Sequence, residues 1–173
     1  MTIEQSWSHS TGEIAPGGIE RHLSATDDER TALVAALGLL ALERLEIRYR
    51  IIPRAGGRFH FKGQLRARVV QECSITLEPV TSDIDEQIDL EFWPGEKPPE
   101  PAAGEHEALA IDEIEPIEND RLAVGRVVFE TLAAALDPFP RAEGAEFDWH
   151  DASPPSQSDN PFAALARLKP KPE

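Results

Sequence analysis

The fold is decided by residues 44–69, which read RLEIRYRIIPRAGGRFHFKGQLRARV. Apolar and polar side chains alternate on both sides of a turn signal, PRAGG, at 53–57. This alternation is typical of strands with one buried face, and Pro and Gly between two such strands predict a hairpin. We therefore expect a long antiparallel hairpin with one apolar face. Gly63 interrupts the second strand, so we expect a bulge or a bend there.

The polar face of this hairpin is strongly basic. Residues 41–70 hold eight Lys and Arg side chains and only two acidic ones. Side chains of a strand alternate between two faces, so the basic residues of both strands share one face. His60 adds an aromatic ring that can stack on a nucleobase. The candidate RNA-binding residues are Arg48, Arg50, Arg58, His60, Lys62, Arg66 and Arg68.

An acidic strand follows at 83–93, within a segment (81–120) that holds fourteen acidic side chains and one Lys. Two interpretations of the basic face stay open. It contacts nucleic-acid phosphates, or the acidic strand neutralises it through cross-strand pairs, each worth about 0.2–1 kcal/mol.

Two helices and a short strand at 19–24 complete the predicted fold. A helix at 27–38 begins with a capping box, Thr26 and Glu29, and ends at Gly38. A second helix at 125–136 is stopped by DPFP. A sheet with one apolar face must be covered. The sequence therefore predicts an α+β fold, an antiparallel twisted sheet or partly open β-barrel of five or more strands with two packed helices.

The two helices are expected to cover the apolar face of the hairpin and of the acidic strand. The sheet residues that we expect both helices to contact are Ile47, Phe61, Leu65 and Ile88.

Composition divides the chain into three parts. We expect one domain at 1–141 with an acidic, Pro-rich loop at 94–108, a flexible linker at 142–159, and a short helical motif at 160–173. Phe162, Leu165 and Leu168 form an apolar stripe in this motif. The stripe is a candidate docking surface, either for the protein's own core or for a partner's groove.

Composition also excludes several classes of function. The 173 residues carry a net charge of −15, which repels phosphate at long range, so any RNA contact depends on a local patch. No apolar run approaches the roughly 18–20 residues of a membrane span, and no secretory signal begins the chain. We therefore expect a cytoplasmic protein without a membrane partner.

No motif in the sequence predicts catalysis. Phosphate-loop, hydrolase-elbow and zinc-protease patterns are missing, and the five histidines lack metal-ligand spacing. The single cysteine, Cys73, excludes an internal disulfide, and we expect a buried strand cysteine rather than a reactive thiol. We expect no enzyme, no cofactor, no metal and no small-molecule substrate.

Several segments together resemble the YceD family, in its alphaproteobacterial branch. They are GQLRARVVQECSITLEPV at 63–80, FWP at 92–94, EPIENDRLAVG at 115–125, ALDPFPR at 135–141 and NPFAALA at 160–166. The resemblance spans about residues 15–170. It implies a noncatalytic role in the accumulation of large-subunit ribosomal RNA and in assembly of that subunit.

The resemblance carries over four signature positions, Cys73, Leu77, Glu78 and Pro79. Many relatives have C-x-x-C there, but Thr76 replaces the second cysteine, so no metal or redox role is implied. Ala123 replaces an Asp that caps the last helix in relatives, so we expect this helix to start differently.

Two functions remain open at this point. The protein is a ribosome-assembly factor that contacts ribosomal RNA or a pre-50S particle through the basic hairpin face. Alternatively, it is an acidic binding module or chaperone for a basic ribosomal protein, and the 81–120 acids form its working surface.

Overall fold

A computed structural model describes residues 3–95 and 113–147 of the chain. Most of the predicted loop at 94–108 and of the linker at 142–159 lies outside these residues, as does the whole motif at 160–173.

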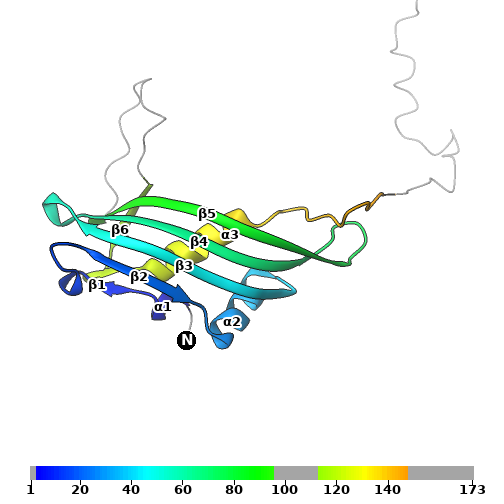
Figure 1. The fold of residues 1–173 in the computed structure, drawn as a ribbon, viewed down its shortest axis with the longest axis horizontal. Helices are drawn as coiled ribbons and strands as arrows, with labels where there is room; N and C mark the ends of the chain where they lie inside the picture. The colour runs from blue at the N-terminus through cyan, green and yellow to red at the C-terminus, as the bar shows by residue number, and fades with distance from the viewer. Residues whose placement is uncertain (1–2, 96–112, 148–173) are drawn as a thin grey trace, which may run out of the picture.

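Five strands form one open, twisted sheet in the order β2-β3-β4-β5-β6 (Figure 1). Their bounds are Ile19–Ser24 (β2), Ala41–Pro53 (β3), Phe59–Glu72 (β4), Pro79–Pro94 (β5) and Glu113–Ile117 (β6). Neighbouring strands are antiparallel except for β6, which runs parallel to β5. The α+β prediction is confirmed, and the sheet has two edge strands, β2 and β6, rather than closing into a barrel.

The hairpin of β3 and β4 forms as the alternation predicts. Ile47 pairs with Leu65 and Ile51 with Phe61, and all four side chains are completely buried. These side chains lie on the inner face of the sheet, whereas the charged residues between them lie on the outer face.

The expected bulge at Gly63 is wrong. Gly63 pairs with Tyr49 in an unbroken register, and the irregularity lies between Leu42 and Arg44. A Cβ at position 63 would lie 3.1 Å from both Tyr49 Cβ and Phe61 Cε1. The rings of Tyr49 and Phe61 stack with centroids 5.2 Å apart. Glycine is therefore needed here because two aromatic side chains approach the backbone closely.

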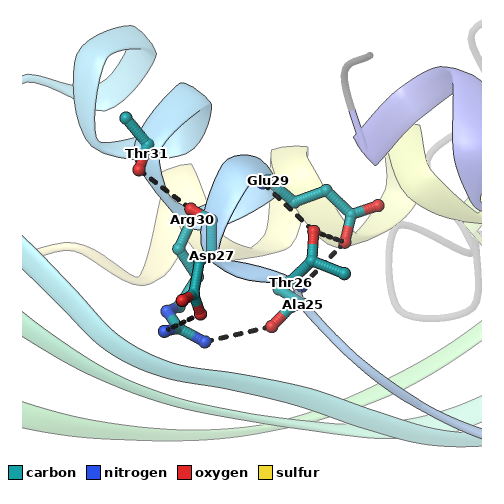
Figure 2. Close-up of polar contacts among 6 residues, drawn as sticks. All are labelled: Ala25, Thr26, Asp27, Glu29, Arg30 and Thr31. Carbon is teal, nitrogen blue, oxygen red and sulfur yellow. Dashed lines mark hydrogen bonds and ion pairs between the residues drawn. The ribbon is translucent and has the colours of Figure 1, made fainter.

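Helix α2 (Asp27–Leu37) has the capping box that the sequence predicts (Figure 2). Thr26 Oγ1 accepts a hydrogen bond from the Glu29 backbone at 3.3 Å, and Glu29 Oε2 accepts one from the Thr26 backbone at 2.9 Å. Gly38, with φ +66°, ends the helix in the left-handed region. Burial acts to raise the pKa of Glu29, but hydrogen bonds from Ser6 and Thr26 lower it overall.

Helix α3 (Val124–Ala135) passes behind the sheet in Figure 1 and packs on β4 and β5, whereas α2 packs on β3. It begins one residue earlier than predicted, and its N-cap residue Ala123 forms no side-chain cap. Leu33 of α2 and Leu132 of α3 belong to one hydrophobic core. This core also contains the four sheet residues that we expected the helices to cover, Ile47, Phe61, Leu65 and Ile88.

The N-terminal segment contains short elements of secondary structure that the sequence did not predict. It contains α1 (Ile3–Ser6), β1 (His9–Ser10) and the helical turn η1 (Thr11–Glu13). A second helical turn, η2 (Ala55–Gly57), lies in the hairpin. Helix α1 packs on α3, and β1 pairs with β7 (Arg121–Leu122).

His9 joins this segment to the sheet, since its Nε2 lies 2.6 Å from Tyr49 Oη. Burial raises the pKa of Tyr49 to about 12, so the hydroxyl stays protonated at neutral pH.

None of the helices in the described part of the chain is long and apolar enough to cross a membrane.

Candidate nucleic-acid interface

The register of the sheet arranges the charged side chains of its outer face in rows that run across the strands. Successive rows read Ser24–Glu46–Arg66–Asp85, His22–Arg48–Gln64–Gln87 and Glu20–Arg50–Lys62–Asp89. Residues that lie opposite each other on neighbouring strands are close enough to interact. The positive charge that each basic side chain presents therefore depends on the residues that lie opposite it on the neighbouring strands.

The basic residues of β4 lie beside the acidic residues of β5 and form ion pairs with them. Lys62 Nζ is 3.1 Å from Asp89 Oδ2, and Arg66 Nε is 3.2 Å from Asp85 Oδ2. Arg68 lies between two carboxylates, 3.1 Å from Glu43 and 3.4 Å from Asp83. These pairs reduce the positive charge that β4 presents.

Arg58 and His60 also have partners on β5. Arg58 is 3.4 Å from Glu91 and lies 5.0 Å from the ring centroid of Trp93. His60 Nε2 is 2.6 Å from Asp89 Oδ1. Hydrogen bonds from His60 and Lys62 hold the pKa of Asp89 below its usual range. The His60 ring, which we considered for stacking on a base, thus contacts the same carboxylate as Lys62.

The arginines of β3 are placed differently. Arg44, Arg48 and Arg50 are exposed, and within residues 3–95 and 113–147 none of them lies within ion-pair distance of a carboxylate. We call these three residues the β3 arginine stripe. Beside Arg48, the row continues through Gln64 and Gln87, which carry no charge.

The structure thus divides the seven predicted RNA-binding residues. Five of them lie beside carboxylates of β5 or beside Glu43, and two, Arg48 and Arg50, do not. Arg44 joins these two, although it is not among the seven residues predicted from the sequence. The alternation at 44, 46, 48 and 50 was the signal that could have found it.

The signature positions lie in and beside the turn that joins β4 to β5. Cys73 is buried, as expected, but it follows the last residue of β4, Glu72, so the prediction of a strand cysteine is wrong. Its sulfur accepts hydrogen bonds from the backbone of Thr76 at 3.4 Å and of Ala142 at 3.3 Å. Hydrogen bonds from the side chain and the backbone of Thr76 are the main reason that the pKa of the thiol is lowered.

The other three signature positions, Leu77, Glu78 and Pro79, follow Cys73 between the end of β4 and the start of β5. Leu77 has φ +62° and an exposed side chain, an unfavourable combination for a branched residue. Thr76 Oγ1 lies 3.3 Å from Glu78 Oε2, and Pro79 is the first residue of β5. The Ser74 backbone donates a 2.8 Å hydrogen bond to Pro140. The turn therefore fastens the chain that follows α3 to the end of the sheet.

No group of three or more His, Cys, Asp or Glu in the described part of the chain could hold a metal ion. The candidate docking residues Phe162, Leu165 and Leu168 lie outside the described residues.

Comparison with known proteins identifies one family. A protein-family model described as "Large ribosomal RNA subunit accumulation protein YceD" matches residues 61–169, which include most of β4 and all of β5 and α3. This description implies a role in the accumulation of large-subunit ribosomal RNA. No curated protein and no solved structure matches the chain.

Proposed function

The chain belongs to the YceD family of large ribosomal RNA subunit accumulation proteins, and on this premise we propose that it supports this accumulation as a noncatalytic factor that contacts ribosomal RNA. The observation that carries the proposal is the β3 arginine stripe, whose three guanidinium groups are exposed and lie away from the carboxylates of β5. The alphaproteobacterial branch, the cytoplasmic location and the pre-50S particle as the site of action are further parts of this proposal.

Arginine is well suited to such a contact. Its planar guanidinium group presents five N–H donors and binds phosphate in a bidentate manner. The amide groups of Gln64 and Gln87 extend the same row without adding negative charge. The interface we propose is therefore small, and it recognises the RNA backbone.

The net charge of −15 affects the affinity of this contact and its dependence on salt. Long-range repulsion between the protein and RNA weakens binding at low salt, so affinity depends on a few close contacts. Each phosphate contact that is lost lowers the slope of log affinity against log salt by about one.

The test uses the full chain with Arg48→Gln and Arg50→Gln together. We expect affinity for a large-subunit ribosomal RNA transcript to fall by about tenfold or more and the salt slope to fall by about two. Fluorescence anisotropy titrations at several salt concentrations measure both quantities.

The matched control removes a β4 ion pair, with Arg66→Gln and Asp85→Asn together, which leaves the net charge unchanged. We expect this control to bind as the unmodified chain does. If the Arg48 and Arg50 variant also bound unchanged, the proposed interface would be wrong.

A second function, an acidic binding module or chaperone for a basic ribosomal protein, is favoured by a different observation. Glu86 lies on the inner face of β5, opposite Leu65 and away from the other acids of this strand. The chain as a whole is also strongly acidic. Under this proposal, deleting residues 94–108 weakens binding of the basic protein and leaves RNA binding intact.

A pull-down from the native cell, with and without nuclease, separates the two proposals. Recovery of large-subunit precursor RNA, with associated proteins removed by nuclease, favours the RNA contact. A single basic ribosomal protein that survives nuclease treatment favours the acidic module.

A further inference from the structure

A groove with a volume of about 380 Å³ lies between α3 and β5, on the side of the sheet opposite the β3 arginine stripe. Its apolar lining comes from Ile88, Leu90, Val127 and Ala135, and Glu86 and Glu130 supply negative charge. This volume is at the lower end of the roughly 300–1,000 Å³ of ligand pockets, so the groove accommodates a few side chains. Its chemistry suits a short segment that is both apolar and basic.

The groove runs along an open part of the sheet edge. Strand β6 pairs only with residues 90–94 of β5. Beside residues 79–89, the described part of the chain supplies no further strand. An edge of this kind presents unpaired backbone N–H and C=O groups, which proteins usually cover or protect with charge. A segment that fills the groove would also cover this edge.

The chain leaves α3 close to this groove. Gln71 Nε2 donates a 2.9 Å hydrogen bond to the carbonyl of Asp137, and the Ser74 backbone donates to Pro140. These bonds hold the outgoing chain against the turn where β5 begins, as the orange segment in Figure 1 shows. From residue 147, the twelve residues 148–159 could span up to about 40 Å, at roughly 3.3–3.6 Å per extended residue.

The end of the chain has the chemistry that the groove requires. Residues 160–173 carry three basic side chains and one acidic one, although the whole chain has a charge of −15. Phe162, Leu165 and Leu168 recur at helical spacing, and the family match extends to residue 169. Asn160 and Pro161 are favourable at the start of a helix.

We propose that residues 160–168 of this chain dock as a short helix in the groove between α3 and β5. The apolar stripe lies on Ile88, Val127 and Ala135, and Arg167 faces Glu86. A helix this short is unstable alone in water, so the groove supplies its stability. Because the segment is tethered, its effective concentration at the groove reaches the millimolar range, and weak contacts are enough.

The experiment uses the full chain with a nitroxide attached through Glu173→Cys, since Cys73 is buried and escapes labelling. We expect the label to broaden the NMR resonances of Ile88, Leu90 and Val127. Phe162→Ala with Leu165→Ala should abolish this broadening, whereas the matched variant Phe147→Ala should keep it, because Phe147 is an exposed aromatic residue outside the motif.

Charge provides a second comparison within the same experiment. Glu86→Lys should weaken the broadening several-fold. Glu78→Lys, the same change at an exposed position in the signature turn, should leave it unchanged.

Two results would overturn the proposal. If broadening occurred only between a spin-labelled and an isotope-labelled copy, the occupant would be a second chain. If the groove resonances were not broadened at all, the groove would be open to another partner. Neither result affects the RNA titrations of the Arg48 and Arg50 variant, because that surface lies on the other side of the sheet.

Discussion

Strands β3 and β4 each place three basic side chains on the same outer face of the sheet, but the two sets differ in their neighbours. Lys62, Arg66 and Arg68 of β4 all lie within 3.4 Å of a carboxylate. The β3 arginine stripe has no such partner within the described residues. Strand order contributes to the difference, because β4 lies beside the acidic strand β5, whereas β3 lies between β2 and β4. Glu20 of β2 lies opposite Arg50, but the two form no ion pair within the described residues.

The comparison shows that the number of basic residues in a hairpin does not determine how much charge it presents. Exposed pairs such as Arg66–Asp85 contribute little stability, about 0.2–1 kcal/mol, but each one removes a positive site from the surface. Neutralisation and nucleic-acid contact, which the sequence presents as alternatives, are therefore assigned to different strands. The first describes β4, and the second is what we propose for β3.

The largest effect is expected from breaking the register on which the comparison depends. Phe61 is completely buried, stacks on Tyr49 and meets the edge of Phe92 at a centroid distance of 6.0 Å. Phe61→Ala should reduce the free energy of unfolding by about 3–5 kcal/mol, because it leaves a cavity on the face that aligns β3, β4 and β5. Urea denaturation measures this loss.

The neighbouring residue on the outer face is the control for this prediction. Lys62→Ala removes only a largely exposed ion pair and should cost less than about 1 kcal/mol. Equal losses for the two variants would show that the outer pairs, and not the inner face, hold the register.

An intermediate effect is expected from releasing the basic residues of β4. Asp85→Asn with Asp89→Asn removes the carboxylates that face Arg66 and Lys62. If the basic residues of β4 fail to bind RNA only because β5 neutralises them, RNA affinity should rise several-fold. The slope of log affinity against log salt should also steepen by up to about two. Anisotropy titrations against large-subunit ribosomal RNA measure both changes.

A change of equal charge elsewhere tests whether this gain is local. Glu143→Gln with Glu146→Gln alters two exposed acids that follow α3. This variant should gain far less affinity than the β5 variant. A similar gain in both would mean that overall charge, and not the pairing on the outer face, limits RNA binding.

The smallest effect is expected from the pH dependence of the β4–β5 pairs. The pKa of Asp89 is lowered chiefly by the hydrogen bond from His60, so His60→Ala should raise it toward its ordinary value of about 3.9. A carboxyl whose pKa is lowered by folding stabilises the protein above its unfolded pKa, and this contribution is lost as pH falls through the folded value. NMR titration of the Asp89 carboxyl carbon measures the shift.

The stability change that accompanies this shift should be slight, because the Asp89 side chain is 54% exposed and solvent screens the pair. The difference in stability between the unmodified chain and His60→Ala should shrink as pH falls below the ordinary pKa of Asp. If the Asp89 pKa did not change in His60→Ala, the short contact to His60 would not be the cause.

Local signals in the sequence account for much of the fold. Strand β2 has the predicted bounds, and α2 ends within one residue of its predicted end, because the Thr26 capping box and Gly38 act on the backbone beside them. The role of Gly63 was not predicted because it depends on Tyr49, a residue of the partner strand whose Cβ lies close to this position, and on the ring of Phe61. The N-terminal elements were missed because strands and helices of two to four residues have too little periodicity to detect.

The candidate site was only partly predictable for the same reason. Alternation placed Arg48 and Arg66 on one face, and this was correct. It could not show that Arg66 lies beside Asp85 while Arg48 lies beside Gln64. The groove was not predicted at all, because it is formed by α3 and β5, which are separated by about thirty residues of sequence.

The sequence by itself determined which residues are buried and which are charged, because a strand places alternate side chains on opposite faces and a helix repeats every 3.6 residues. Family membership also follows from the sequence alone. Only the tertiary structure decided which charges remain available, since that depends on strand order and register across segments far apart in the chain. Electrostatic pairing acts over a few ångströms in space, and alternation along one strand carries no information about the side chain on the next.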